Sequence, residues 1–175
     1  MDSGFAAIQA ETYDISQIVE NAVAKGRPQA GDKKIGIHIN NRCKSETTFL
    51  LDGFILANVL DRLVSNAIKF TATGDVTVTI EAMGTEGVRI CVSDTGIGMD
   101  PAHQSMIFEE FEGHSPNTAR TGGGSGLGMN IIRREIELMG GTISVAGEAG
   151  KGTAFTINLP SGHACDIQDQ TYGLH

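Results

Sequence analysis

Two glycine-rich segments hold the residues of this sequence that are best suited to bind a phosphate. The first is 94–99 (DTGIGM), and the second, 122–129 (GGGSGLGM), runs directly into a helical pattern. Glycines let backbone amides approach a phosphate closely, and a helix N-terminus presents unpaired N–H groups with a partial positive charge. Either segment alone is equally typical of an ordinary turn or hinge, but together they predict two walls of a nucleotide pocket.

A stripe of polar side chains on a predicted helix adds possible ligands. Apolar residues recur with helical spacing from 54 to 70, and the opposite face repeats at steps of four, four and three. That face consists of Asn58, Arg62, Asn66 and Lys69. Such a stripe is usually the solvated side of an amphipathic helix. Asparagine is only a middling helix former, however, and its amide oxygen suits Mg²⁺, so a metal or phosphate role stays open.

Asp94 follows a predicted strand and is the candidate for binding a base. Its carboxylate can accept a hydrogen bond from an exocyclic amine such as that of adenine, while Gly96 and Gly98 let the base lie against the backbone. Two other nucleotide motifs are excluded. The second glycine segment does not follow a strand, as a Rossmann motif must, and Lys151 is followed by Gly152 where a P-loop needs Ser or Thr. We therefore predict that 147–152 is a hairpin turn.

Helical and strand patterns alternate along the 175 residues, which suits one α/β domain. Helices are predicted at 14–24, with Asp14 as the cap, at 54–70, from 100–101 onward and at 126–139. Strands are predicted at 34–40, 47–51, 75–80, 88–92, 142–146 and 154–159. We expect 34–40 and 47–51 to join a sheet.

Composition excludes several classes of protein. A net charge of −8 leaves no uniformly basic surface, so general nucleic-acid binding is excluded. The sequence shows no apolar run long enough to span a bilayer and no basic leader with an apolar core. Cys43, Cys91 and Cys165 are widely spaced without a Cys-x-x-Cys pair, which predicts neither a zinc site nor a disulfide framework and favours a reducing, cytoplasmic setting.

The order of these features resembles the N, G1, F and G2 boxes of the catalytic, ATP-binding domain of sensor histidine kinases, in the wider family of gyrase, Hsp90 and MutL. The segments that carry the resemblance are 65–71 (SNAIKFT), 94–99, 107–111 (IFEEF) and 124–128. It implies a Bergerat-type two-layer α/β sandwich, with a mixed, mostly antiparallel sheet and about three helices on one face. It further implies that 1–12 is a linker stub from a dimerisation helix and 13–160 the catalytic domain. Residues 161–175 are polar, which predicts a disordered tail or linker.

The resemblance also assigns roles to individual residues. It implies that Asn66 coordinates Mg²⁺, that Lys69 contacts phosphate and that Phe70 packs near the nucleotide, while Asp94 holds the adenine amino group. The other ATP-site residues that it implies are Gly96, Gly98, Met99, Phe108, Phe111, Gly124, Ser125, Gly126, Leu127 and Gly128. Residues 113–123 would form a mobile lid.

Arg62 departs from the family pattern, which usually has a second asparagine at this position. Arginine has no acceptor and cannot replace an amide oxygen, but it can meet a phosphate directly, so Arg62 joins Asn66 and Lys69 as a candidate catalytic residue. In the gyrase branch a glutamate at this position activates the nucleophile, and a direct ATPase mechanism would lack that base here.

Histidine kinases instead take the nucleophile from a separate dimerisation and phosphoacceptor domain. The histidines here, namely His38, His103, His114, His163 and His175, fall in predicted strands, loops or the tail and not on a long helix. The expected partners are therefore that missing domain and a response regulator or receiver domain, in a homodimeric parent protein. The alternatives are a degenerate, ATP-independent interaction module and a nucleotide-driven clamp of the gyrase type.

Overall fold

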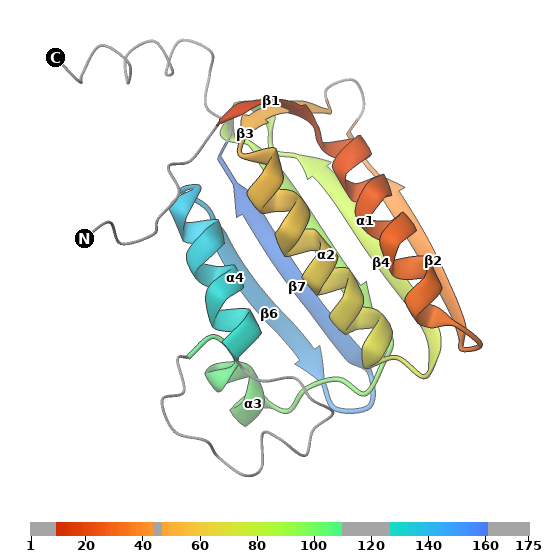
Figure 1. Cartoon of the computed structure of the whole chain (residues 1–175). Coiled ribbons are helices and arrows are strands. Elements are labelled where there is room, and N and C mark those ends of the chain that lie inside the picture. Colours follow the sequence, from red (N-terminus) through yellow and green to blue (C-terminus); the bar gives the residue numbers. More distant parts are fainter. Residues whose placement is uncertain (1–9, 44–46, 110–126, 161–175) are drawn as a thin grey trace, which may run out of the picture.

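The computed structural model describes residues 10–43, 47–109 and 127–160 (Figure 1). Its helices are α1 (Ile15–Ala30), α2 (Gly53–Lys69), α3 (Pro101–Met106) and α4 (Leu127–Leu138), with a 3-10 turn η1 (Gly84–Glu86). Its strands are β1 (Glu11–Asp14), β2 (Lys34–Asn41), β3 (Thr48–Leu51), β4 (Thr73–Ala82), β5 (Val88–Asp94), β6 (Thr142–Glu148) and β7 (Gly152–Leu159).

Five strands form one sheet in the order β2-β4-β5-β7-β6. Strands β2 and β4 run parallel, and the other three neighbouring pairs run antiparallel. Helices α1, α2 and α4 cover one face of this sheet (Figure 1). The predicted two-layer α/β sandwich with a mixed, mostly antiparallel sheet is therefore confirmed. Strands β6 and β7 form an antiparallel pair, so the turn between them is the predicted hairpin turn.

The core lies between the sheet and the helices because each element has one apolar face. Period-two alternation places one side of each central strand under the helices. The buried strand residues include Val76, Val78, Ile80, Ile90, Val92 and Ile157, and α2 buries Leu56, Leu60 and Leu63 against them. Helix α2 starts where predicted, because the Asp52 carboxylate accepts hydrogen bonds from the N–H groups of Phe54 and Ile55, each at 3.1 Å.

Helix α1 extends beyond its predicted end at residue 24. Asp14 caps its start as expected, but the helix continues to Ala30 and includes Pro28. The reason is tertiary: Gly26 is buried against α2, where a Cβ would lie 2.8 Å from Val64 Cγ1. Close packing of the two helices stabilises a polar segment whose sequence gives no apolar repeat.

Two other expectations need correction. Strand β3 does not join the main sheet with β2 but pairs antiparallel with β1, a short strand that the sequence pattern did not indicate. Strand β3 is followed directly by Asp52, the N-cap of α2, and Figure 1 shows the β1–β3 pair at the N-terminal ends of α1 and α2. His103 lies in α3 and not in a loop. None of the described helices is long and apolar enough to cross a membrane.

Candidate functional site

Asp94 ends β5 and begins the turn formed by 95–99. Its Oδ1 accepts hydrogen bonds from the N–H of Gly96 at 2.9 Å and from the N–H of Thr153 at 3.3 Å. The carboxyl group is half-buried, and this desolvation raises its pKa above the ordinary value, although the two N–H donors act in the opposite direction. The backbone therefore fixes one carboxylate oxygen, and within the described residues no hydrogen bond involves Oδ2.

The turn is held against the end of α2. The N–H of Ile97 donates to the carbonyl oxygen of Phe70 at 3.2 Å. A Cβ on Gly96 would lie only 2.2 Å from that same oxygen, so residue 96 must be glycine for this approach. Thr71, the next residue of the α2 motif, places its hydroxyl close by. That hydroxyl is buried and has no hydrogen-bond partner among the described residues.

The hairpin turn between β6 and β7 holds the other side of the 95–99 turn. The N–H of Gly150 donates to Ile97 O at 2.7 Å, and a Cβ on Gly98, which has φ +73°, would lie 1.9 Å from Glu148 O. The Gln104 amide, from α3, donates to Met99 O at 2.8 Å and to Gly147 O at 2.7 Å. One side chain thus joins the end of the turn to the hairpin.

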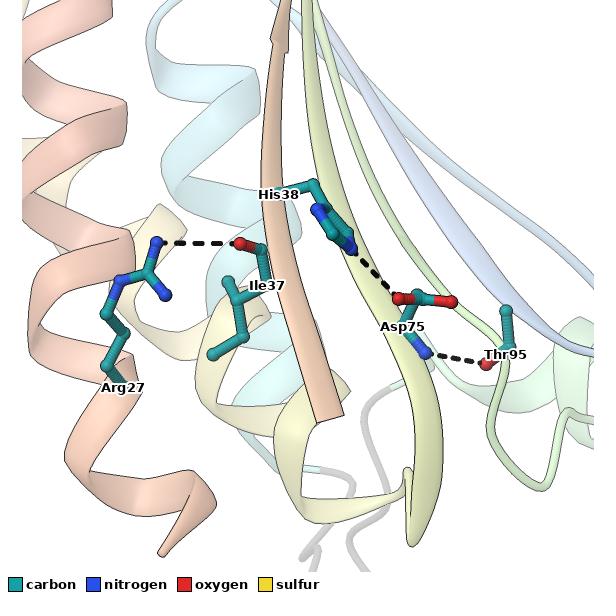
Figure 2. A network of polar contacts seen from close by, with 5 residues as sticks. All are labelled: Arg27, Ile37, His38, Asp75 and Thr95. Atoms are coloured by element: carbon teal, nitrogen blue, oxygen red, sulfur yellow. Dashed lines mark hydrogen bonds and ion pairs between the residues drawn. The ribbon is translucent and has the colours of Figure 1, made fainter. Parts of the chain in front are cut away.

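A polar network lies behind the same turn and joins it to the edge of the sheet (Figure 2). Two hydrogen bonds join Thr95 and Asp75. The Thr95 hydroxyl accepts from the Asp75 N–H at 2.9 Å, and the Thr95 N–H donates to Asp75 O at 3.0 Å. His38 of β2 contacts the Asp75 carboxylate, with 2.9 Å between Nε2 and Oδ1. At the residue before His38, Arg27 of α1 donates to Ile37 O at 3.5 Å.

The polar stripe of α2 faces α4 at one residue of the glycine-rich motif. The amide Nδ2 of Asn66 donates to Met129 Sδ at 3.8 Å, and Asn66 is half-buried. Lys69 is exposed, with Nζ 5.6 Å from the centre of the Phe70 ring. The structure therefore places the α2 motif beside the start of α4, which carries the end of the second glycine-rich segment.

Arg62 lies one turn before Asn66 and is exposed. It has an electrostatic partner on α4, since its positive charge lowers the pKa of the Glu135 carboxyl. Burial is the larger effect, however, and the net result is a raised pKa. The Oε2 atom of Glu135 is buried and has no hydrogen-bond partner in the described part of the chain. The sequence pattern did not single out Glu135.

Phe108 is half-buried and anchors the segment after α3. Its ring meets the Phe155 ring edge-on, with the centroids 6.3 Å apart, and Arg133 of α4 lies 6.0 Å from its centre. Of the other predicted site residues, Phe111, Gly124, Ser125 and Gly126 lie outside the described residues, as does the predicted lid 113–123. Leu127 begins α4, and a Cβ on Gly128 would meet no described residue outside α4 within 4 Å.

The described residues contain no group of three or more His, Cys, Asp or Glu side chains that could hold a metal ion. Asn66 is the predicted ligand, and its Nδ2 is engaged with Met129. Its Oδ1 accepts no hydrogen bond from the described residues. A single amide oxygen fits Mg²⁺ that is bound mainly through phosphate oxygens and water, because this ion keeps several waters and few protein ligands.

Several residues of this site have no signature in the sequence. Thr153 and Gln104 contact the 94–99 segment from other elements, and Lys33 contacts the end of α2. For Thr153 the sequence offers only a weak indication, namely its position between the glycine of a predicted turn and a predicted strand.

Comparison with known proteins identifies the family of this chain. The chain belongs to the family of histidine kinase-, DNA gyrase B-, and HSP90-like ATPases, whose model matches residues 51–163. It is 34% identical over 153 residues to the autoinducer 2 sensor kinase/phosphatase LuxQ of Vibrio vulnificus, a match that covers 85% of this chain and 18% of the relative. It is 34% identical over 163 residues to the sensor protein SrrB of Staphylococcus aureus, covering 91% and 27%.

Solved structures show the same fold. Full-length ShkA in complex with AMPPNP matches with a TM-score of 0.78 and 34% identity, covering 92% of this chain and 33% of that one. The catalytic domain of histidine kinase ThkA matches with a TM-score of 0.74 and 22% identity, covering 87% and 96%. The chain thus spans less than a third of the two sensor proteins but nearly all of an isolated catalytic domain.

Proposed function

We propose that this chain is the catalytic domain of a sensor histidine kinase, which binds Mg-ATP and presents the γ-phosphate to a histidine on a separate domain. One observation carries the proposal: the half-buried Asp94 carboxylate, held by two backbone N–H groups, and the amide of Asn66 flank the same end of α2. This arrangement supports a site that holds a base acceptor beside a phosphate-side ligand.

The base end of the site is formed by the 94–99 turn. Asp94 accepts a hydrogen bond from the adenine amino group through the oxygen that the backbone leaves free. Gly96 and Gly98 permit close approach of the base, and Met99 gives an apolar wall, since it packs half-buried against the core. The unpartnered Thr71 hydroxyl is available to a water or to the base itself.

The phosphate end is formed by α2 and the start of α4. Lys69 and Arg62 supply positive charge, with Phe70 below Lys69 and Phe108 holding α4 through Arg133. The segment Gly124, Ser125, Gly126, Leu127 and Gly128 closes over the phosphates in this proposal. Gly128 supports it: a glycine in a helix costs about 1 kcal/mol relative to alanine, and no neighbour in the described structure requires one there.

Asn66 would hold Mg²⁺ through Oδ1. When bound, the ion neutralises charge on the β- and γ-phosphates. The residues of this chain then bind and orient ATP and exclude water from it, and catalysis rests on positioning and charge stabilisation rather than on a base from this chain. The partners of this proposal are a dimerisation and phosphoacceptor domain and a response regulator or receiver domain, in a homodimeric parent.

The two alternatives find no support in the structure. A non-binding interaction module has no use for a half-buried carboxylate held by two N–H groups, or for a glycine at 128 that no described neighbour requires. A gyrase-type clamp needs a base where Arg62 lies.

Calorimetric titration with Mg-ATP tests the proposal, using the wild type, Asp94→Asn and Asp61→Asn. Asp61 is the matched control, because it lies on α2 but forms an ion pair with Lys25 at 3.1 Å, away from the site. We expect the wild type to bind, Asp94→Asn to lose at least about tenfold in affinity and Asp61→Asn to stay within about twofold. Equal affinities for all three, or no binding by the wild type at millimolar ATP, would refute the assignment.

A further inference from the structure

Lys33 lies between α1 and β2, outside every predicted motif, yet its ammonium group contacts the C-terminal end of α2, the helix that carries the proposed phosphate ligands. Its Nζ donates to Ile68 O at 3.0 Å and to Lys69 O at 3.3 Å. These carbonyl groups belong to the last turn of α2, whose usual donors lie beyond the helix end. Ile68 O also accepts from the N–H groups of Phe70 and Thr71, the latter at 3.4 Å. Lys33 therefore acts as a C-terminal cap supplied by a different segment of the chain.

Two backbone hydrogen bonds fix the main chain at Lys33, and so fix the point from which its side chain extends. The N–H of Lys33 donates to Ala30 O at 2.9 Å, and its carbonyl accepts from the Ile35 N–H at 3.0 Å. In the described ranges 10–43, 47–109 and 127–160, no carboxylate forms an ion pair with Lys33. Its charge is thus directed at the carbonyl end of α2.

That end of α2 is where the proposed phosphate ligands lie. Asn66, Lys69 and Phe70 occupy the last turn and the residue after it, and the carbonyl of Phe70 is itself bound by Ile97. The carbonyls of Ile68, Lys69 and Phe70 are therefore each bound by a group from outside the helix. Lys33 holds two of them, and the 94–99 turn holds the third.

The electrostatic consequence concerns the triphosphate. The C-terminal end of a helix carries a partial negative charge of about half an elementary charge, which opposes the approach of a polyanion. An ammonium group on the terminal carbonyls offsets this charge. It also fixes the backbone from which the side chains of Asn66 and Lys69 extend.

We infer that Lys33 is a positioning residue for the triphosphate: it caps α2, orients Asn66 and Lys69 and offsets the negative helix end beside the phosphates. This inference rests on the proposed function. It assigns a role to a residue that touches neither the base nor the phosphates.

The test compares Lys33→Met, Lys33→Arg and Lys34→Met. Methionine keeps the aliphatic stem and removes the charge, arginine keeps the charge, and Lys34 is a neighbouring exposed lysine at the start of β2. Affinities for Mg-ATP and for adenosine are measured by calorimetry, and thermal unfolding checks that each variant is folded. Amide hydrogen exchange at residues 68–71 reports the cap directly, without any ligand.

We expect Lys33→Met to weaken Mg-ATP binding by about three- to tenfold and adenosine binding by less than about twofold, with faster exchange at residues 68–71. Lys33→Arg should recover most of the ATP affinity, and Lys34→Met should match the wild type. An equal loss for ATP and adenosine would show a merely structural cap and overturn the inference, as would unchanged ATP affinity in Lys33→Met.

Different results would refute the proposed function and the role of Lys33. A wild type that bound neither ligand would refute the proposed function and the triphosphate role of Lys33 with it. Unchanged exchange in Lys33→Met, together with normal ATP binding by the wild type, would refute only the role of Lys33.

Discussion

The backbone N–H of Ile97 donates a hydrogen bond of 3.2 Å to the carbonyl oxygen of Phe70. This bond joins the glycine turn after β5 to the residue that follows α2, so the proposed base and phosphate ends of the site are connected through the main chain before any ligand binds. A change at this contact should therefore affect both ends together.

Gly96→Ala is predicted to damage the fold as well as the site. Its Cβ would lie 2.2 Å from Phe70 O and 2.8 Å from Thr71 Oγ1, and backbone atoms cannot move aside as a flexible side chain can. We expect a loss of about 2 kcal/mol or more in the free energy of unfolding, measured by urea denaturation, with weaker ATP binding. Wild-type stability in this variant would contradict the close approach of the two segments.

Gly128→Ala is predicted to separate stability from binding. Apart from the backbone of α4 itself, no atom of the described residues lies within 4 Å of the added Cβ, and alanine is the better helix former. The free energy of unfolding should therefore rise by up to about 1 kcal/mol. If the start of α4 contacts phosphates, Mg-ATP affinity should nevertheless fall by about tenfold. A variant that was more stable and bound ATP normally would remove Gly128 from the site.

Arg62 and Glu135 should be energetically coupled across α2 and α4. Removing the arginine leaves the Glu135 charge, whose Oε2 is buried without a hydrogen-bond partner among described residues, with less compensation. We expect Arg62→Asn to lower stability at neutral pH by less than about 1 kcal/mol, since the carboxyl is only half-buried. The double variant Arg62→Asn, Glu135→Gln should recover that loss.

The same variants distinguish a structural role of Arg62, beside Glu135, from a role in binding phosphate. If Arg62 also meets phosphate, ATP affinity should stay low in the double variant even though its stability returns. Additive effects on stability would show that the two side chains do not interact.

The raised pKa of Asp94 leads us to predict opposite pH dependences for ATP binding and for stability. Burial raises its pKa above the ordinary value of about 3.9, and the ionised form is needed to accept from adenine, so ATP affinity should fall as the pH falls through the raised pKa. The folded state holds this proton more tightly than the unfolded state. The contribution of Asp94 to stability is therefore greatest below the ordinary pKa and decreases as the pH rises through the raised one.

Affinity and stability are compared between the wild type and Asp94→Asn at each pH. Both proteins contain Glu135, whose pKa is also raised, so its contribution to the pH dependence of stability cancels in the difference. Calorimetry gives the affinity and urea denaturation the stability at each pH. A difference in affinity that did not change with pH in this range would argue against a carboxylate contact with the base.

Much of the fold followed from local patterns in the sequence. The alternation Val76, Val78, Ile80 fixes which side of β4 faces the helices, and Asp14 marks where α1 begins. The motif residues Asn66 and Asp94 were also evident, because their chemistry and their order do not depend on the packing.

Other features arose only when separate elements packed together. Lys33 reaches a carbonyl 35 residues away, and Gln104 reaches one 43 residues away. Helix α1 extends past Gly26 because α2 packs against it, and the charges of Glu135 and Arg62 interact because α4 lies beside α2.

The physical reason for this division is the range of the interactions. Periodicity and capping act over a few residues, so the sequence by itself determined the elements, their buried faces and the glycine segments that suggest a nucleotide site. A lone lysine or glutamine has no local signature. Only the packing of the helices on the sheet decided which carbonyl group or charge each of these side chains would meet.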